Sequence, residues 1–383
     1  MELEADEATN HTQIPSTSSK DSILANPTLP QELITAILVR LPVKYLLKFK
    51  CVSKHWFALI SSPEFVKTHL SFSAKHSTHH RLVLKSVKRH TLEYNLKLCS
   101  VSSLFYEPVT EAFDLDYPMK DPQKFFRIVS SVNGLICYCI GFNDLVLWNP
   151  STRKFKKVPD LVHTQTDDYH FSYGFGYDEV HDDYKVVAIF REISKRKYDA
   201  KIYSLKSDSW RTLDDFQGKI LFNEYSSGKL VNGKLHWVTT GGDDRVITSI
   251  DLVDEKCRKV MEPYYGEESL YLTLGVLESD FSVVLSNHER MDVWVMKEYG
   301  VKESWTKLYT IIKCPGCATS PPICMSIEGE ILHTFGSTLT ILKPENDTMR
   351  FPKVTNIDGH VGEKLYIESL VCPISQNEPM SQH

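Results

Sequence analysis

Two cysteines separated by two residues are the first candidate for chemistry in this sequence of 383 residues. Cys314 and Cys317 have the spacing of redox and zinc sites, and Cys324 and His333 follow, so that four metal ligands can be drawn. No second pair with this spacing is present, and the segment falls in a loop between expected strands, not at a helix N-terminus that would lower a thiol pKa. We therefore predict no metal site and no cofactor. An enzyme that uses the Cys314 region is kept as a further hypothesis, after the two binding functions considered below.

The remaining polar clusters are typical of solvated segments. His76, His79 and His80 lie between a helical and a strand-like region, and we interpret them as a solvated linker. Adjacent aspartates point apart on a strand and suit turns better than acid–base pairs, which applies to Asp167-Asp168, Asp182-Asp183, Asp214-Asp215 and Asp243-Asp244. The sequence has no glycine-rich phosphate loop, nucleophile elbow or helix with two histidines and a glutamate. We therefore predict that the protein is not an enzyme.

Composition excludes several classes of protein. The net charge of −5 argues against nucleic acid or an anionic membrane as the main partner, because either would favour a basic surface. No apolar run approaches the ~20 residues that span a bilayer, and the N-terminus is acidic where a secretory signal would be basic. Nine cysteines, spread thinly, indicate reduced thiols and a cytoplasmic or nuclear location, or both.

The first ordered region is predicted to be helical. Residues 1–26 are rich in Ser, Thr and Pro and are expected to form a disordered tail, as are residues 376–383. From Leu29 to Leu70 the apolar spacing predicts three helices, the last of which ends near Pro63. On the first helix, Leu33, Ile37 and Leu41 form one apolar stripe, and Ile34 and Leu38 form a second stripe beside it.

Two apolar stripes are more than this small unit can cover. About 40 residues bury too little surface to be stable on their own, and each exposed Leu or Ile forgoes ~1.5–3 kcal/mol of burial. One stripe can line the unit's own core, so the other needs an external surface. That surface is either another protein or the rest of the same chain, and the residues alone leave both possibilities open.

After Leu70 the pattern changes to short strands that repeat. Val132-Asn133-Gly134-Leu135 recurs as Val231-Asn232-Gly233-Lys234 and, more faintly, as Ile327-Glu328-Gly329-Glu330, in steps of about 99 and 96 residues. A second unit, seen as Tyr184-Lys185-Val186-Val187 and Phe281-Ser282-Val283-Val284, alternates with the first and gives a period of about 48 residues. Four-stranded units at this period are typical of β-propeller blades, although a pair of β-sandwiches would also show alternating strands.

Strands that start near residues 82, 133, 183, 232, 281 and 329 predict six blades. A strand from Leu365 to Val371 is left over, and we assign it to the first blade because closing the ring removes an open sheet edge. The predicted fold is therefore an α+β multidomain protein, with a three-helix module at residues 27–71 and an all-β, six-bladed propeller at residues 72–375.

Motifs in both parts resemble those of plant F-box proteins. The helical part resembles the F-box in the motifs Leu29-Pro30-Gln31-Glu32-Leu33, Ile37-Leu38-Val39-Arg40-Leu41-Pro42-Val43-Lys44, Phe49-Lys50-Cys51-Val52-Ser53-Lys54-His55-Trp56 and Leu59-Ile60-Ser61-Ser62-Pro63-Glu64-Phe65. The strand region resembles the F-box-associated, kelch-like domain in Asn149-Pro150-Ser151-Thr152-Arg153, Phe175-Gly176-Tyr177-Asp178, Tyr184-Lys185-Val186-Val187, Val293-Trp294-Val295-Met296 and Glu303-Ser304-Trp305. The resemblance covers about residues 28 to 373 and extends to the S-locus F-box type. Lys48 is a small departure, since the family often has arginine there.

The resemblance implies a substrate receptor of an SCF-type ubiquitin ligase, whose F-box binds a Skp-type adaptor and, through it, a cullin. Carried over by position, the adaptor face includes Leu29, Pro30, Leu33, Ile37, Leu41, Pro42, Leu46, Leu47, Val52 and Trp56. Of these, Leu46 and Val52 are expected to have a purely structural role, and an aromatic anchor is expected at the interface. The propeller is expected to bind a target protein for ubiquitination. The alternatives are a glycan or small ligand on the propeller, or an interaction module that acts without SCF.

The residues that recognise the substrate cannot be identified from the sequence. The recurring aromatic residues fit core packing. Segments that differ between blades are therefore the better candidates for residues that recognise the substrate. We therefore predict that specificity lies in five long loops: Val162 to Phe171, Arg191 to Asp199, Thr240 to Arg245, Glu262 to Leu270 and Lys313 to Pro322.

Overall fold

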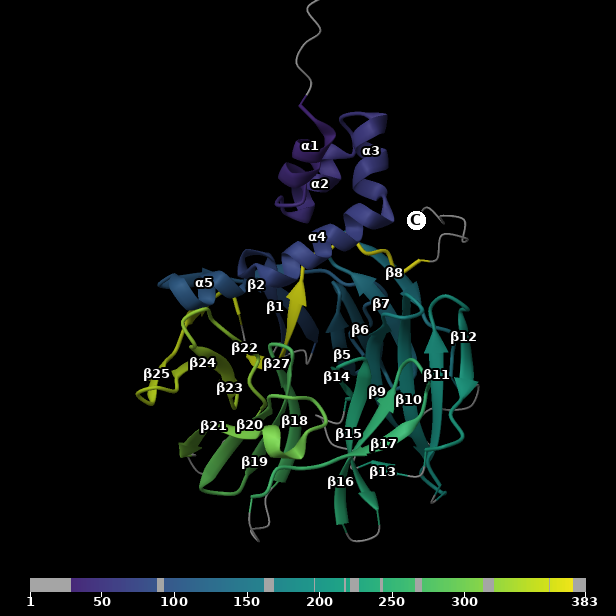
Figure 1. The fold of residues 1–383 in the computed structure, drawn as a ribbon, viewed down its shortest axis with the longest axis vertical. Coiled ribbons are helices and arrows are strands. Elements are labelled where there is room, and N and C mark those ends of the chain that lie inside the picture. Colours follow the sequence, from purple (N-terminus) through teal and green to yellow (C-terminus); the bar gives the residue numbers. More distant parts are fainter. Residues whose placement is uncertain are drawn as a thin grey trace, which may run out of the picture.

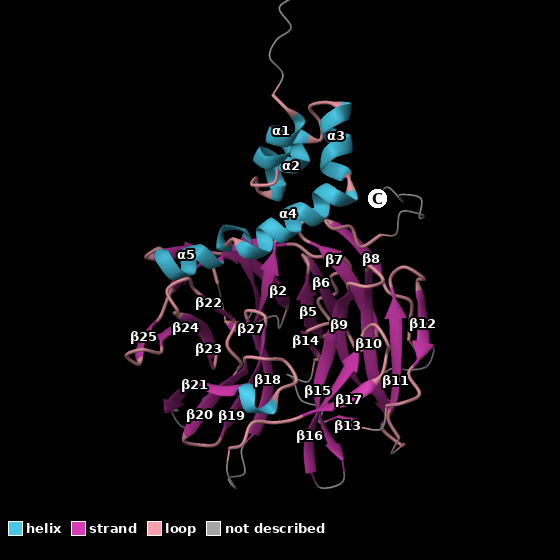
Figure 2. Cartoon of the chain, in the orientation of Figure 1, coloured by secondary structure: helices cyan, strands magenta, loops and turns pink. Residues whose placement is uncertain are grey.

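The computed structural model describes residues 29–87, 93–161, 169–195, 197–216, 218–220, 227–241, 244–265, 271–312, 320–357 and 359–374. Both predicted tails and the Cys314–Cys317 pair lie outside these residues. The described chain forms a helical N-terminal module at one end of a ring of antiparallel sheets (Figure 1). Figure 2 shows helices α1 to α5 gathered at this end of the strands. Of the described helices, none has the length and apolar character needed to cross a membrane.

Four helices, not the predicted three, precede the first described strand. They are α1 (Gln31–Leu38), α2 (Val43–Phe49), α3 (Lys54–Ser61) and α4 (Pro63–Lys75). Pro63 was expected to end the last helix, but it occupies the first turn of α4, where Ser62 Oγ accepts a hydrogen bond from the Phe65 N–H at 3.2 Å. Helix α4 therefore crosses the predicted boundary at residues 71–72, and it lies across the end of the ring (Figure 1).

The described strands form six blades, which confirms the predicted propeller. Blade 1 contains β27 (His360–Ile367), β1 (His80–Val87), β2 (Tyr94–Ser100) and β4 (Phe113–Leu115), and blade 2 contains β5 (Phe126–Val132), β6 (Leu135–Ile140), β7 (Asp144–Asn149) and β8 (Lys154–Lys157). Blade 3 contains β9 (Tyr169–Asp178), β10 (Asp183–Glu192), β11 (Asp199–Ser204) and β12 (Ser209–Thr212), and blade 4 contains β13 (Lys219–Ile220), β14 (Lys229–Val231), β15 (Lys234–Gly241), β16 (Asp244–Asp251) and β17 (Cys257–Val260). Blade 5 contains β18 (Tyr271–Leu277), β19 (Asp280–Ser286), β20 (Arg290–Met296) and β21 (Trp305–Ile312), and blade 6 contains β22 (Cys324–Met325), β23 (Ile331–Phe335), β24 (Thr338–Lys343) and β25 (Thr348–Arg350).

Three shorter helical elements and one strand pair complete the described fold. Helix α5 (Val101–Tyr106) follows β2, and η1 (Ser77–His79) and η3 (Lys302–Ser304) are single 3₁₀ turns. Strands β3 (Val109–Glu111) and β26 (Lys353–Thr355) pair in parallel, which ties the end of blade 6 to blade 1.

The repeated Asn-Gly sequences form tight turns between the first two strands of a blade. Asn133 and Gly134 have φ angles of 53° and 78°, and Asn232 and Gly233 have φ angles of 48° and 68°. A two-residue hairpin turn with both φ values positive requires residues that tolerate the left-handed region, which explains why this dipeptide recurs with the blades.

The leftover strand closes the ring, as predicted. Strand β27 pairs antiparallel with β1 from His80 opposite Ile367 to Ser86 opposite His360. We name residues 366–371 the C-terminal strap. The buried Asn149 side chain holds the strap: its Nδ2 donates to the carbonyl oxygens of Ser369 at 3.0 Å and Val371 at 2.7 Å, and its Oδ1 accepts from the Tyr366 hydroxyl at 3.1 Å.

The strap also attaches the helical module to the propeller. Leu370 packs into the module core with the buried side chains of Leu38, Leu46 and Phe65. The backbone N–H of Glu368 donates to the carbonyl oxygen of His79 at 3.1 Å. The module core and the ring closure therefore share one segment of chain.

His79 at this junction is buried, so the prediction of a solvated linker was wrong for that residue, whereas His76 is exposed and His80 is half-buried. His79 is 3% exposed, and its ring centroid lies 5.8 Å from those of both His69 and Phe72. The His76 ring stacks on Phe72 at 3.8 Å. Because burial disfavours the charged imidazolium, it lowers the pKa of His79 to about 4, and positive neighbours add to this effect.

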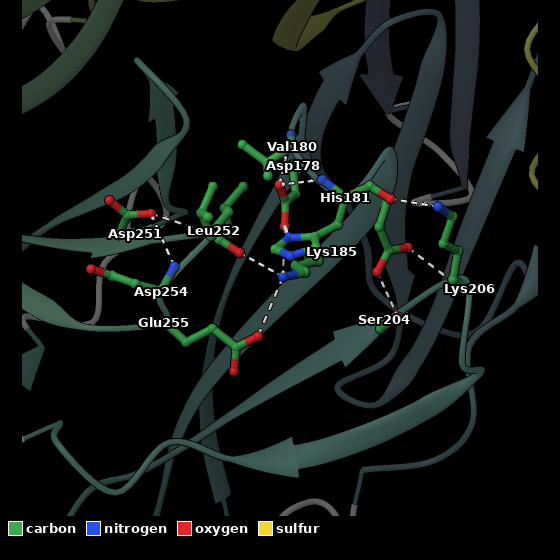
Figure 3. A network of polar contacts seen from close by, with 12 residues as sticks. Asp178, Val180, His181, Lys185, Ser204, Lys206, Asp251, Leu252, Asp254 and Glu255 are labelled. Carbon is green, nitrogen blue, oxygen red and sulfur yellow. Dashed lines mark hydrogen bonds and ion pairs between the residues drawn. The ribbon is translucent and has the colours of Figure 1, made fainter.

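A buried ion pair joins blades 3 and 4 (Figure 3). Asp178, at the end of β9, is 1% exposed, and Lys185 Nζ lies 2.9 Å from its Oδ2. The same ammonium donates to the carbonyl oxygen of Leu252 at 2.5 Å and lies 3.3 Å from Glu255, beyond β16. Burial alone would raise the pKa of Asp178, but hydrogen bonds from Lys185 and His181 outweigh it and hold the pKa at about 2.

We expect Lys185→Met to lower the free energy of unfolding by about 3 kcal/mol or more, because it leaves the buried Asp178 carboxylate without its ammonium partner. Urea unfolding at pH 7 measures this. Lys67→Met is the matched control, since it removes an exposed ion pair with Asp182 on a neighbouring turn and should cost less than about 1 kcal/mol. Equal losses in the two variants would contradict the structural role of Lys185.

We also expect stability to fall as the pH drops from about 6.5 toward 4. Burial lowers the pKa of His79, His236 and His333 to about 4, whereas an unfolded histidine titrates near ~6.5. The unfolded chain therefore binds more protons in this window, and acid favours unfolding. His79→Gln should flatten the pH dependence of the unfolding free energy by the contribution of one proton, and His288→Gln, at an exposed position, is the control. Identical slopes in both variants would count against this explanation.

Candidate interaction surfaces

One apolar stripe, formed by Leu33 and Ile37 of α1 and by Leu29 just before the helix, is left outside the module core. Leu29, Leu33 and Ile37, spaced four residues apart, are 57%, 52% and 53% exposed, whereas Leu38 on the other side is 2% exposed. Of the predicted stripe of Leu33, Ile37 and Leu41, the first two residues are exposed, but Leu41 lies beyond the end of α1 and packs against the module core. The inner stripe packs within the chain, whereas the described part of the chain leaves Leu29, Leu33 and Ile37 exposed. We name these three residues the outer stripe.

The ten predicted adaptor-binding residues differ in burial. Five are exposed, namely Leu29, Pro30, Leu33, Ile37 and Val52. Four are partly buried, namely Leu41, Pro42, Leu47 and Trp56, and Leu46 is fully buried. Leu46 is 0% exposed and packs the module core, so it offers no surface to a partner. The prediction of a purely structural role was wrong for Val52, which is 62% exposed because it lies in the turn between α2 and α3, outside either helix.

The exposed aromatic residues of the module differ from the expected anchor. Trp56 packs edge-on against Phe49 with ring centroids 5.4 Å apart, so it belongs mostly to the core. Phe57 and Tyr45, which sequence analysis did not select, are 56% and 48% exposed. A signal for Phe57 was available, because it falls off the face of α3 that Trp56 and Ile60 define.

The two ends of the propeller can be told apart by contacts with the module. Asp182, in the turn between β9 and β10, forms an ion pair with Lys67 of α4 at 3.0 Å. A Cβ on Gly134, in the turn between β5 and β6, would lie 2.1 Å from Ser369 Oγ of the strap. Turns between the first and second strands of a blade therefore face the module. Because neighbouring strands are antiparallel, turns between the second and third strands, and connections to the next blade, lie at the opposite end, which we name the distal end.

The described residues that flank the five loops selected from the sequence lie at the distal end. Two of the loops connect the second and third strands of a blade, and three connect one blade to the next. Residues 162–168, 196, 242–243, 266–270 and 313–319 of these loops lie outside the described residues. Large exposed apolar side chains occur on the described flanks: Ile193, Tyr264, Tyr271 and Ile312 are 52%, 83%, 70% and 79% exposed.

A cavity of about 1130 Å³ lies between the innermost strands of all six blades. It extends from Ala74 of α4 to Phe142 in the turn between β6 and β7 at the distal end. Its walls are formed by β27, β5, β9, β14, β18 and β22. The cavity therefore follows the axis of the ring.

Metal chemistry finds no support in the described part of the chain. No group of three or more His, Cys, Asp or Glu side chains there could hold a metal ion. Cys324 is 4% exposed, and burial raises its pKa to about 12, so the thiol stays protonated. The hypothesis that rests on Cys314 and Cys317 concerns residues outside the described part.

Comparisons with known proteins agree with both parts of the fold. Residues 27–68 match the F-box domain family, and residues 68–335 match the F-box associated beta propeller domain family. The F-box/kelch-repeat protein At3g23880 of Arabidopsis thaliana is 32% identical over 354 residues, which cover 90% of this chain and 96% of that protein. The F-box protein CPR1 of the same plant is 31% identical over 317 residues, or 75% of this chain and 73% of that protein. Among solved structures, TolB from Acinetobacter baumannii is 10% identical with a TM-score of 0.48, over 80% of this chain and 73% of TolB.

Proposed function

The chain belongs to the plant F-box proteins with an F-box-associated propeller domain, and we propose that it is a substrate-recognition subunit of an SCF-type ubiquitin ligase. In this proposal the F-box binds a Skp-type adaptor, and through it a cullin, and the propeller binds a target protein. The observation that supports it best is the uncovered apolar stripe of Leu29, Leu33 and Ile37.

The outer stripe has the properties of a docking surface for the adaptor. Its three side chains are each more than half exposed, Leu33 and Ile37 on one face of α1 and Leu29 just before the helix. Burial of each is worth ~1.5–3 kcal/mol. The inner stripe cannot take this role, because Leu38 and its neighbours already pack against α4 and Leu370 of the strap. Exposed Val52 and Phe57 lie on the same small module and can extend the contact.

We propose the distal end of the propeller as the surface for the target. The described residues that flank the five long loops, among them the exposed side chains of Tyr264, Tyr271 and Ile312, belong to this end, away from the F-box. Exposed aromatic residues on loops that differ between blades suit a specific protein contact. The protein would contribute no bond-making step of its own, and its effect on the rate would come from holding the target near the ubiquitin-loading enzyme.

A cytoplasmic or nuclear location, or both, remains part of the proposal. The cysteines of the described residues are free thiols, among them the exposed Cys51 and Cys372. Free thiols are usual in compartments that keep cysteine reduced.

We expect Leu33→Asp to weaken binding of a plant Skp-type adaptor at least about 10-fold, because it places a charge in the apolar stripe and removes the burial of one Leu. Co-purification and calorimetric titration measure this. Ile327→Asp is the matched control, since Ile327 is a 92% exposed apolar residue in a propeller turn. Thermal unfolding should be unchanged in both variants. Binding of the wild-type strength by folded Leu33→Asp would overturn the proposed adaptor contact.

We expect Ile312→Asp with Tyr271→Ala to lose target proteins while keeping the adaptor. Proximity labelling in plant cells treated with a proteasome inhibitor, followed by mass spectrometry, compares this double variant with the wild type. Leu33→Asp is the reciprocal control and should keep the targets, and Ile327→Asp should behave as wild type. If the double variant labels the same proteins as the wild type, the distal end is not the target surface.

A further inference from the structure

Two lysines meet in the cavity on the propeller axis. Lys229 lies on β14 of blade 4 and Lys364 lies on β27 of blade 1, and both side chains line the cavity. In a ring of six blades, blades 1 and 4 face each other across the axis. The two side chains extend from opposite walls into this one cavity.

The cavity has an excess of positive charge. Its described lining includes the cations Lys85, Arg127, Lys229 and Lys364 and the acids Glu278 and Glu363, although the chain as a whole has a net charge of −5. The Nε of Arg127 is buried without a hydrogen-bond partner. The cationic surface is therefore a local feature of the channel.

The contacts around the two lysines leave their positive charge incompletely compensated. Lys229 Nζ donates to Ser227 Oγ at 3.5 Å, which is a long contact with a neutral group. Glu363 attracts both lysines and offsets part of their charge. Burial lowers the pKa of both ammonium groups, and the positive charge of Lys364 lowers that of Lys229 further. An anion placed between them would remove the repulsion and satisfy several donors at once.

We propose that the axial cavity binds a small oxyanion ligand, held between Lys229 and Lys364 by its phosphate or carboxylate group. Each ammonium has three N–H donors, and both point into a space bounded by opposite blades. The cavity volume of about 1130 Å³ exceeds that of a single oxyanion, so the group can belong to a larger small molecule. A bound anion would link blade 1 to blade 4 across the axis.

Thermal unfolding of the full chain tests this proposal with inorganic phosphate and with citrate, each compared with chloride at equal ionic strength. At concentrations well above the dissociation constant, one or both should raise the unfolding temperature by on the order of 3 °C. The rise should persist in the control Lys302→Met, which removes an exposed lysine, and vanish in Lys229→Met/Lys364→Met. A response to phosphate alone identifies a phosphate ligand, and a response to citrate identifies a carboxylate ligand.

The ligand-free double variant provides an independent readout. Because it removes two repelling cations, it should unfold at the same temperature as the wild type in chloride, or higher. The single variants Lys229→Met and Lys364→Met, tested by calorimetric titration with the stabilising anion, should each bind at least about 10-fold more weakly than the wild type. The proposal is overturned if neither anion stabilises the wild type beyond chloride. It is also overturned if the anions raise the unfolding temperature of the double variant as much as that of the wild type. Either result leaves the adaptor surface on α1 unaffected.

Discussion

The pairing of β27 with β1 is the constraint on which the rest of the structure depends. It joins the last described strand to the first, so that the inner edge of β1 is paired and blade 1 has four strands. The same strand supplies one wall of the axial cavity, including Lys364, and the strap that follows it supplies Leu370 to the F-box core. Ring closure, the channel and the attachment of the F-box are consequences of one antiparallel contact, which Asn149 holds in place.

This shared segment also sets the relation between the two interaction surfaces. Because α4 and the strap bury the inner stripe of the F-box, the outer stripe of α1 is held at a fixed place at one end of the ring (Figure 1). The described residues that flank the five long loops lie at the other end, because neighbouring strands of a blade run in opposite directions. A target on the distal end and an adaptor on α1 would therefore be separated by the whole height of the propeller, and neither would compete with the other for surface.

Much of the fold was predictable from sequence, because the blade period, the Asn-Gly turns and the leftover strand are local or repeating signals. The outer stripe of α1 followed from helical spacing. The fourth helix was missed because Pro63 was interpreted as a stop, although a proline after Ser62 equally begins a helix. Burial of His79, exposure of Val52 and the approach of Lys229 to Lys364 depend on contacts between distant segments, and no local pattern reports those contacts.

The position of the strap after the strands of blades 2 to 6 has a consequence for protein synthesis. A ribosome releases the chain from its N-terminus onward, so the F-box helices and five blades emerge before the residues that complete them. Until β27 and Leu370 are made, β1 has an open inner edge and the F-box core has a gap. A chain that stops before β27 would thus be defective in both the propeller and the F-box at once.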